Sequence, residues 1–133
     1  MKEETPTLYN KTVMDHFMNP RNMGDIQDAD GIGEVGAAAC GDIMKVSLKV
    51  SNDGVVTDAR FKTFGCGSAI AASSMATELI KGRTIDDLEK NFSNDEVVSA
   101  LNGLPPIKVH CSVLAQEAIM AAIEDYKKKH KIS

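Results

Sequence analysis

The spacing of apolar residues changes from strand-like to helix-like near Gly65, and this change limits the fold more than any other feature. Before it, apolar and polar residues alternate across 45–49, which predicts a half-buried strand. Asn52-Asp53-Gly54 predicts a hairpin turn, and residues 55–64 predict the returning strand. After Gly65, residues 69–81 are rich in Ala, Ile, Met and Leu at helical spacing. A hairpin followed directly by a helix is therefore expected.

Further helices are expected on both sides of this hairpin. Pro20 ends a short helix over residues 8–19, and Thr84 begins another over 85–89. The remaining elements are an edge strand over 33–37, a helix over 93–102 and a long helix from Ser112 onward. Strands followed by helices are typical of the α+β class. We predict one domain over residues 1–133, with a small antiparallel three-stranded sheet, helices packed on one face, an N-terminal helix and a long C-terminal helix.

The apolar pattern also predicts which face of each element is buried. In the first helix the apolar positions are Leu8, Val13, Phe17 and Met18. In the hairpin they are Ile43, Val46, Leu48 and Val50 on one strand and Ala59, Phe61 and Thr63 on the other. In the last helix they are Val113, Leu114, Ala118, Ile119, Ala122, Ile123 and Tyr126.

Charge, apolar stretches and cysteine content argue against several classes of protein. The net charge is -4, which argues against a dedicated nucleic-acid binder. No stretch approaches ~18 consecutive apolar residues, so no membrane span is expected. Residues 1–7 lack the apolar core of a signal peptide, and we expect a cytoplasmic protein. Three cysteines are an odd number for a disulfide framework, and in a reducing compartment they favour metal binding or reactivity.

The three cysteines all fall at junctions between predicted elements. Cys40 precedes a strand, whereas Cys66 and Cys111 each precede a helix. Unpaired backbone N–H groups and the helix dipole at such a position stabilise a thiolate, which is the form that binds metal and attacks sulfur. Asp42, two residues after Cys40, and His110, next to Cys111, add further metal-ligating groups.

Each of these residues also has a purely structural interpretation. A single cysteine often acts as a small buried hydrophobe, and His110 or Asp42 alone would more often be a packing or turn residue. Three cysteines beside Gly, His or Asp in predicted loops favour a joint site. There is no C-x₂-C pair, so neither a zinc ribbon nor a ferredoxin motif is present. Composition and periodicity thus support an α+β domain with a Cys₃ site completed by Asp or His.

Four long segments resemble the IscU/NifU family of iron–sulfur cluster assembly scaffolds. They are YNKTVMDHFMNPRN from Tyr9, GAAACGDIMKVSLKV from Gly36, ARFKTFGCGSAIAASS from Ala59 and LPPIKVHCSVLAQEAI from Leu104. The segments follow the family's order and span nearly the whole chain. Ala38 stands where many members have Pro. The presence of His110 and the separation of Cys66 from Cys111 fit the IscU branch better than the SufU branch.

The resemblance implies a role for each residue of the site. Cys40, Cys66 and Cys111 would be cluster ligands and sulfur acceptors, Asp42 would tune cluster lability, and His110 is a candidate fourth ligand. The segment Leu104-Pro105-Pro106-Ile107-Lys108 is similar to the family's chaperone-recognition motif, with Ile107 in place of Val. The implied cargo is iron and a transient 2Fe–2S cluster, with Zn²⁺ in the cluster-free form. The implied partners are a cysteine desulfurase, a DnaK-like chaperone with its J-protein, frataxin and apo iron–sulfur proteins.

Elementary coordination chemistry is consistent with a scaffold role. Three thiolates plus a weaker oxygen or nitrogen ligand hold iron yet release it more readily than four thiolates. We expect Cys111 to receive persulfide sulfur first, because Lys108 and the helix dipole favour its thiolate.

Other functions remain alternatives. One is a zinc-dependent sulfur acceptor of the SufU type, and another is an interaction module whose cysteines are structural. An enzyme is not expected, because the chain has no Gly-rich phosphate loop and no Ser-centred nucleophile elbow. Adjacent side chains of an extended segment point apart, which argues against a Cys111–His110 nucleophile pair.

Overall fold

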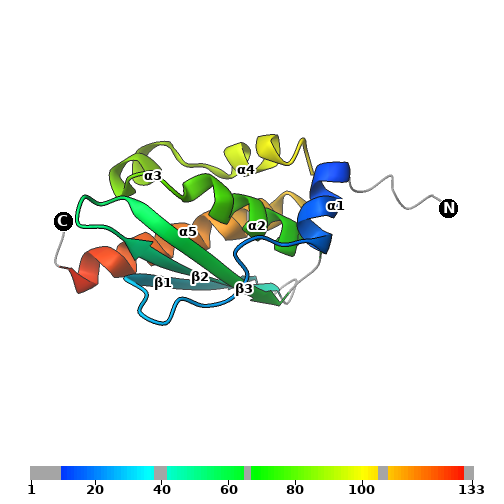
Figure 1. The fold of residues 1–133 in the computed structure, drawn as a ribbon. Coiled ribbons are helices and arrows are strands. Elements are labelled where there is room, and N and C mark those ends of the chain that lie inside the picture. The colour runs from blue at the N-terminus through cyan, green and yellow to red at the C-terminus, as the bar shows by residue number, and fades with distance from the viewer. Residues whose placement is uncertain (1–9, 38–41, 65–66, 105–107, 131–133) are drawn as a thin grey trace.

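The structure is a computed structural model that describes residues 10–37, 42–64, 67–104 and 108–130, with only the backbone described for Ala37 and Asp42. Its elements are α1 (Lys11–Met18), β1 (Gly31–Ala37), β2 (Asp42–Val50), β3 (Val56–Phe64), α2 (Gly67–Ile80), α3 (Ile85–Asn91), α4 (Asn94–Ala100) and α5 (His110–Lys129). Figure 1 shows the helices gathered over one face of the sheet. This arrangement confirms the predicted α+β class with its three-stranded sheet and long C-terminal helix.

The sheet has the strand order β1-β2-β3, and both neighbouring pairs are antiparallel. Gly54 has a φ of +79° in the turn between β2 and β3, a conformation that glycine adopts without strain. The predicted hairpin turn is therefore confirmed. β1 begins at Gly31 rather than at Gly33. The inward positions at its start are glycines that lie against α5, so the sequence there carries no alternating apolar pattern.

The core lies between the sheet and the helices. Met44, Val46 and Leu48 of β2 are buried, as are Ala59 and Phe61 of β3, which confirms the predicted inward face of β3. The prediction for Ile43 was wrong, because its side chain is 42% exposed. Side chains alternate between the two faces of a strand, and on β2 the inward set begins at Met44. Ile43 therefore points to the open face of the sheet.

The helix predictions were right about existence and partly wrong about boundaries and faces. α2 and α5 each begin two residues earlier than expected, because apolar spacing reports the buried face and not the first turn. On α1, Val13 and His16 are buried, whereas Phe17 and Met18 are 37% and 66% exposed. On α5, Val113 is 36% exposed and the rest of the predicted stripe is buried. Leu8 lies outside the described residues.

Local signals around α3 behave as expected. Gly82 has a φ of +84° just after α2, and the Thr84 hydroxyl accepts a hydrogen bond of 3.0 Å from the backbone N–H of Asp87. Ser93 occupies the N-cap position of α4, but its side chain makes no capping hydrogen bond. Within the described part of the chain, no helix has the length and apolar character needed to cross a membrane.

Candidate functional site

One end of each of the three strands lies at the same end of the sheet. Ala37, the last residue of β1, is the ladder partner of Asp42, the first residue of β2. Ile43 is in turn the partner of Phe64, the last residue of β3. Gly67 begins α2 only three residues after Phe64. We call this end of the sheet, formed by Ala37, Asp42 and Phe64, the site end, because the segments that carry the predicted ligands follow or precede these residues in the sequence.

Helix α5 also begins at the site end. A Cβ atom added at Gly31 would lie 2.9 Å from the Cβ of Tyr126, and one added at Gly33 would lie 2.3 Å from the carbonyl oxygen of Ala118. β1 and α5 therefore run in opposite directions in close contact. From Gly33, β1 runs about 13 Å to its last residue. From Ala118, α5 runs back about 11 Å to Cys111. Cys111 thus lies beside the end of β1, as Figure 1 shows for the start of α5.

Cys111 and His110 lie together in the first turn of α5. The Cys111 side chain is fully buried, and its Sγ atom lies 3.6 Å from Nε2 of His110, which is half-buried. The expectation that these adjacent side chains point apart assumed an extended chain and was wrong, because both residues are helical. The contact joins a thiol sulfur and an imidazole nitrogen, two of the groups that iron and zinc prefer.

The other predicted site residues are only partly described. Leu104 is half-buried and packs against the core, and Lys108 follows the undescribed segment 105–107. The residues and groups outside the description are Cys40, Cys66, Pro105, Pro106, Ile107 and the side chain of Asp42. Among the side chains that are described, no group of three His, Cys, Asp or Glu residues could hold a metal ion. The five-residue ligand set therefore stays a prediction.

A groove of about 360 Å³ lies on the open face of the sheet beside the site end. Its lining residues are Glu34, Ile43, Lys45, Lys62, Thr63 and Phe64. Phe64 is 78% exposed and stands directly across the ladder from the exposed Ile43. Asp25 pairs with both lysines of the groove, and its hydrogen bond to Lys62, followed by the one to Lys45, lowers its pKa. The groove thus combines an exposed apolar pair with a charged margin.

Asn10 fixes the start of α1 against the end of α4. Its side-chain Oδ1 accepts a hydrogen bond of 2.9 Å from the backbone N–H of Val13, which makes Asn10 the N-cap of α1. Its Nδ2 group lies 2.9, 3.0 and 3.2 Å from the carbonyl oxygens of Leu101, Asn102 and Gly103. One side chain therefore joins α1 to the segment that leads into Leu104 and the predicted chaperone motif. The sequence reasoning missed this role.

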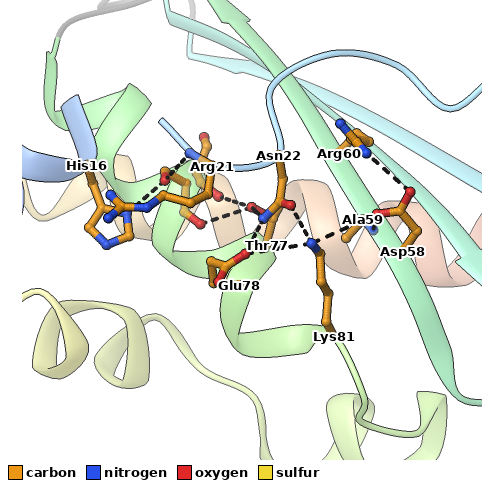
Figure 2. Close-up of polar contacts among 11 residues, drawn as sticks. His16, Arg21, Asn22, Asp58, Ala59, Arg60, Thr77, Glu78 and Lys81 are labelled. Carbon is orange, nitrogen blue, oxygen red and sulfur yellow. Dashed lines mark hydrogen bonds and ion pairs between the residues drawn. The ribbon is translucent and has the colours of Figure 1, made fainter. Parts of the chain in front are cut away.

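The far end of α1 is held by a second set of polar contacts, shown in Figure 2. The buried His16 lies with its Nδ1 atom 2.7 Å from the Ser74 hydroxyl of α2, which also accepts the backbone N–H of Arg21 at 2.9 Å. The Ser74 hydroxyl therefore contacts both α1 and the segment that follows it. Burial, followed by the positive charge of Arg21, lowers the pKa of His16. The neutral form of His16 is therefore favoured in the folded protein.

Asn22 extends these contacts to the edge of the sheet. Its φ of +65° is a left-handed conformation, which Asn tolerates better than most residues. Its carboxamide donates to Thr77 and Glu78 of α2 and accepts from Lys81, while its carbonyl accepts the backbone N–H of Phe61 on β3. Figure 2 shows these side chains turned toward Asn22. The NPRN segment thus anchors α1 to both the C-terminal part of α2 and β3.

Comparison with known proteins places the chain in a family. The sequence profile described as the NifU-like N terminal domain matches residues 8–133, nearly the whole chain. The chain belongs to this family. The predicted IscU/NifU resemblance is therefore confirmed, and the matched span includes all three cysteines and the segment from Leu104 to Lys108.

Individual family members are similar over almost their full length. The iron–sulfur cluster assembly scaffold protein IscU of Azotobacter vinelandii is 55% identical over 124 residues, which cover 91% of this chain and 95% of that protein. The protein of the same name from Escherichia coli (strain K12) is 51% identical over 126 residues, covering 92% and 97%. A crystal structure of the N-terminal part of a NifU-like protein from Brucella abortus has a TM-score of 0.74 at 22% identity, covering 94% of this chain and 98% of that one. This last likeness supports the fold.

Proposed function

We propose that this chain is a scaffold on which an iron–sulfur cluster is assembled and from which it is transferred. The observation that carries the proposal is its identity of more than half to full-length relatives named as such scaffolds, aligned over nearly the whole chain. A scaffold holds and hands over a cargo and does not turn over a substrate, in agreement with the expectation that the chain is not an enzyme. The geometry of the site end supports the same proposal.

Chain connectivity supports a joint site for the three cysteines. Cys66 directly precedes Gly67 in the sequence, and Cys40 precedes Asp42 by two residues. Gly67 and Asp42 both adjoin the site end, where α5 places Cys111. We therefore propose Cys40, Cys66 and Cys111 as the thiolate ligands of a 2Fe–2S cluster.

Asp42 and His110 are the proposed exchangeable ligands. His110 already lies against the Cys111 sulfur, and Asp42 starts the strand that pairs with the end of β1. Oxygen and nitrogen ligands bind a cluster iron less firmly than thiolates, so either residue would complete the site and still allow release. The same donor set suits Zn²⁺ in the cluster-free protein, because three thiolates with a nitrogen or oxygen form a common tetrahedral zinc site.

The burial of Cys111 adds a requirement to sulfur delivery. We propose Cys111 as the first acceptor of persulfide sulfur from a cysteine desulfurase. A fully buried thiol cannot meet a sulfur donor on another protein, so Cys111 must become exposed before transfer. Pairing of the neighbouring His110 with the sulfur would then orient the acceptor.

The remaining proposed partners follow from the same role. A DnaK-like chaperone with its J-protein would bind Leu104-Pro105-Pro106-Ile107-Lys108, frataxin would assist assembly, and apo iron–sulfur proteins would receive the cluster. A cytoplasmic location suits this chemistry, because a reducing compartment keeps the three thiols from forming disulfides.

Anaerobic reconstitution with iron and sulfide tests the proposed function. The scaffold is expected to develop the visible sulfur-to-iron charge-transfer absorption of a cluster and to pass it to an apo-ferredoxin. Single Cys→Ser variants at positions 40, 66 and 111 should each lower the yield strongly, whereas Ser73→Cys, which adds a thiol elsewhere on α2, should not raise it. A colourless protein that retains zinc would contradict the scaffold and support a zinc-dependent sulfur acceptor.

A further inference from the structure

Asn102 and Gly103 form the only Asn-Gly pair in the sequence, and they occupy the turn that follows α4. Asn102 is exposed, and a Cβ atom added at Gly103 would meet no described atom within 4 Å other than those of its chain neighbours. Asparagine loses its side-chain amide most readily before glycine, because glycine has no side chain to hinder attack by its own backbone nitrogen. The turn after α4 therefore carries a pair of residues that can react with each other in water.

The reaction needs only these two residues and water. The Gly103 nitrogen gives up its proton to a solvent base and forms a bond to Cγ of Asn102. The Cγ–Nδ2 bond then breaks, and the amide nitrogen takes up a proton from water and leaves as ammonia. Water adds to either carbonyl of the resulting cyclic imide and breaks its C–N bond, which gives aspartate or its β-linked isomer. The sequence of steps is a substitution followed by a hydrolysis, so no oxidant or reductant is consumed.

The folded structure restrains both reacting groups. The Gly103 N–H donates a hydrogen bond of 2.8 Å to the carbonyl oxygen of Val98, which holds the proton that must leave. The Nδ2 group of Asn102 donates a hydrogen bond of 2.9 Å to the Thr12 hydroxyl of α1. Asn10, the N-cap of α1, binds the carbonyl oxygens of both Asn102 and Gly103 at 3.0 and 3.2 Å. Contacts from the start of α1 therefore fix the side chain and the backbone of this turn.

We propose that Asn102 is a site of spontaneous deamidation and that the docking of α1 on the turn controls its rate. While α1 is docked, the Gly103 nitrogen keeps its proton and the Asn102 side chain stays bound to Thr12. When the first turn of α1 is released, Asn102 and Gly103 rotate freely and the ring closes. Local openings of this kind occur in folded proteins at a lower free-energy cost than global unfolding. The inference concerns the fold itself and does not depend on cluster assembly.

The product of the reaction disfavours renewed docking of α1. Aspartate at position 102 has no Nδ2 group to donate to Thr12. Its negative charge lies just after the C-terminal end of α4, where the last helix carbonyl groups already concentrate partial negative charge. The β-linked isomer also lengthens the backbone by a methylene group, which shifts the carbonyl oxygens that Asn10 binds. Deamidation thus releases α1 from the segment that leads into Leu104.

The test measures the rate of deamidation at position 102 by peptide mass spectrometry, during incubation of the full chain in mildly alkaline buffer. The parent is expected to react more slowly when folded than in urea. Asn10→Ala should raise the rate in the folded protein about tenfold, because the cap and the carbonyl contacts hold α1 on the turn. Thr12→Val, which removes one exposed contact, should raise it less. The control Thr84→Ala removes the N-cap of α3, away from the turn, and should react at the parental rate.

The same experiment shows whether α1 is the controlling element. A parental rate in both Asn10→Ala and Thr12→Val would overturn the inference, and Thr12→Val decides alone if Asn10→Ala does not fold. Equal acceleration by Thr84→Ala would assign the reaction to global unfolding and overturn it as well. A chain that keeps its amide at position 102 even in urea would show that the pair is not a modification site.

Hydrogen exchange tests the consequence for α1. Asn102→Asp is the direct product of the reaction and can be made by substitution. Its α1 amides are expected to exchange faster than those of the parent, whereas the amides of α3 should exchange at the parental rate. Unchanged exchange of the α1 amides in Asn102→Asp would show that the product leaves α1 docked, and would overturn the proposed release.

Discussion

The Asn10 side chain offers a quantitative test of how α1 is held at the site end. Its two functional atoms make separable contacts: Oδ1 caps α1, and Nδ2 donates to the carbonyl groups that end α4. Loss of an N-cap costs about 1 kcal/mol. The Nδ2 group has two hydrogens for three carbonyl oxygens, so it makes about two net hydrogen bonds, each worth about 0.5 kcal/mol at this partly buried position. Asn10→Ala should therefore lower the free energy of unfolding by about 2 kcal/mol.

A second variant separates the two contributions. Asn10→Ser keeps a capping oxygen but has no amide to reach the α4 carbonyls, so it should lose about 1 kcal/mol, half of the alanine effect. Urea unfolding followed by circular dichroism at 222 nm measures both variants, with the slope of the transition checked for constancy. Equal losses for the two variants would show that the capping oxygen contributes nothing, and an unchanged stability of Asn10→Ser would show that the carbonyl contacts contribute nothing. A loss below about 0.5 kcal/mol for Asn10→Ala would refute the assignment of Asn10 as a connector of α1 and α4.

Four further predictions address packing, pH and the site. Gly33→Ala should destabilise the protein by about 3 kcal/mol, because its Cβ would lie 2.3 Å from the Ala118 carbonyl oxygen. The control Ile32→Ala, on the open face of the sheet, should cost about 0.5 kcal/mol in the same urea assay. The lowered pKa of His16 means that the folded protein binds a proton less readily than the unfolded chain, so stability should be full above about pH 6.5 and decline below it. His16→Asn should reduce the fall in melting temperature between pH 7 and pH 5. An equal fall in the variant and the parent would show that other groups cause the pH dependence. Asp42→Ala should slow the loss of a reconstituted cluster, which is measured by the decay of its visible absorption. A rate of cluster loss equal to that of the parent protein would exclude Asp42 as the exchangeable ligand. Phe64→Ser should slow desulfurase-dependent assembly and leave sulfide-driven assembly unchanged, because Phe64 is 78% exposed beside the site end; equal slowing of both would indicate damage to the site itself.

The sequence pattern predicted elements better than it predicted faces. The alternation from Ala59 to Phe64 correctly separated inward from outward residues, because both faces of β3 differ clearly in polarity. Ile43 was misplaced because an apolar residue at a strand end need not follow the buried face. On α1, hydrophobicity favoured Phe17 over His16, yet His16 is the buried residue, since Ser74 supplies a polar partner that only the tertiary structure reveals.

The sequence supplied the residue types of the proposed site but could not supply its geometry. Cys40, Cys66 and Cys111 are far apart in sequence, and no spacing rule brings them together. Their proposed convergence rests on two features of the fold, the ladder that aligns the strand ends and the antiparallel contact of β1 with α5. Asn10 carried no signal at all, because capping residues are common in any helical protein.

Mössbauer spectroscopy of the protein reconstituted with ⁵⁷Fe and sulfide under argon tests the central proposal, a cluster held by three thiolates and one exchangeable ligand. A 2Fe–2S cluster bound in this way has one iron with two cysteine ligands and one iron with a single cysteine and an oxygen or nitrogen. Two quadrupole doublets of equal area are therefore expected, and substitution of any one of the three cysteines should abolish them. A single doublet from two equivalent irons, or iron that binds without forming a cluster, would contradict the proposal.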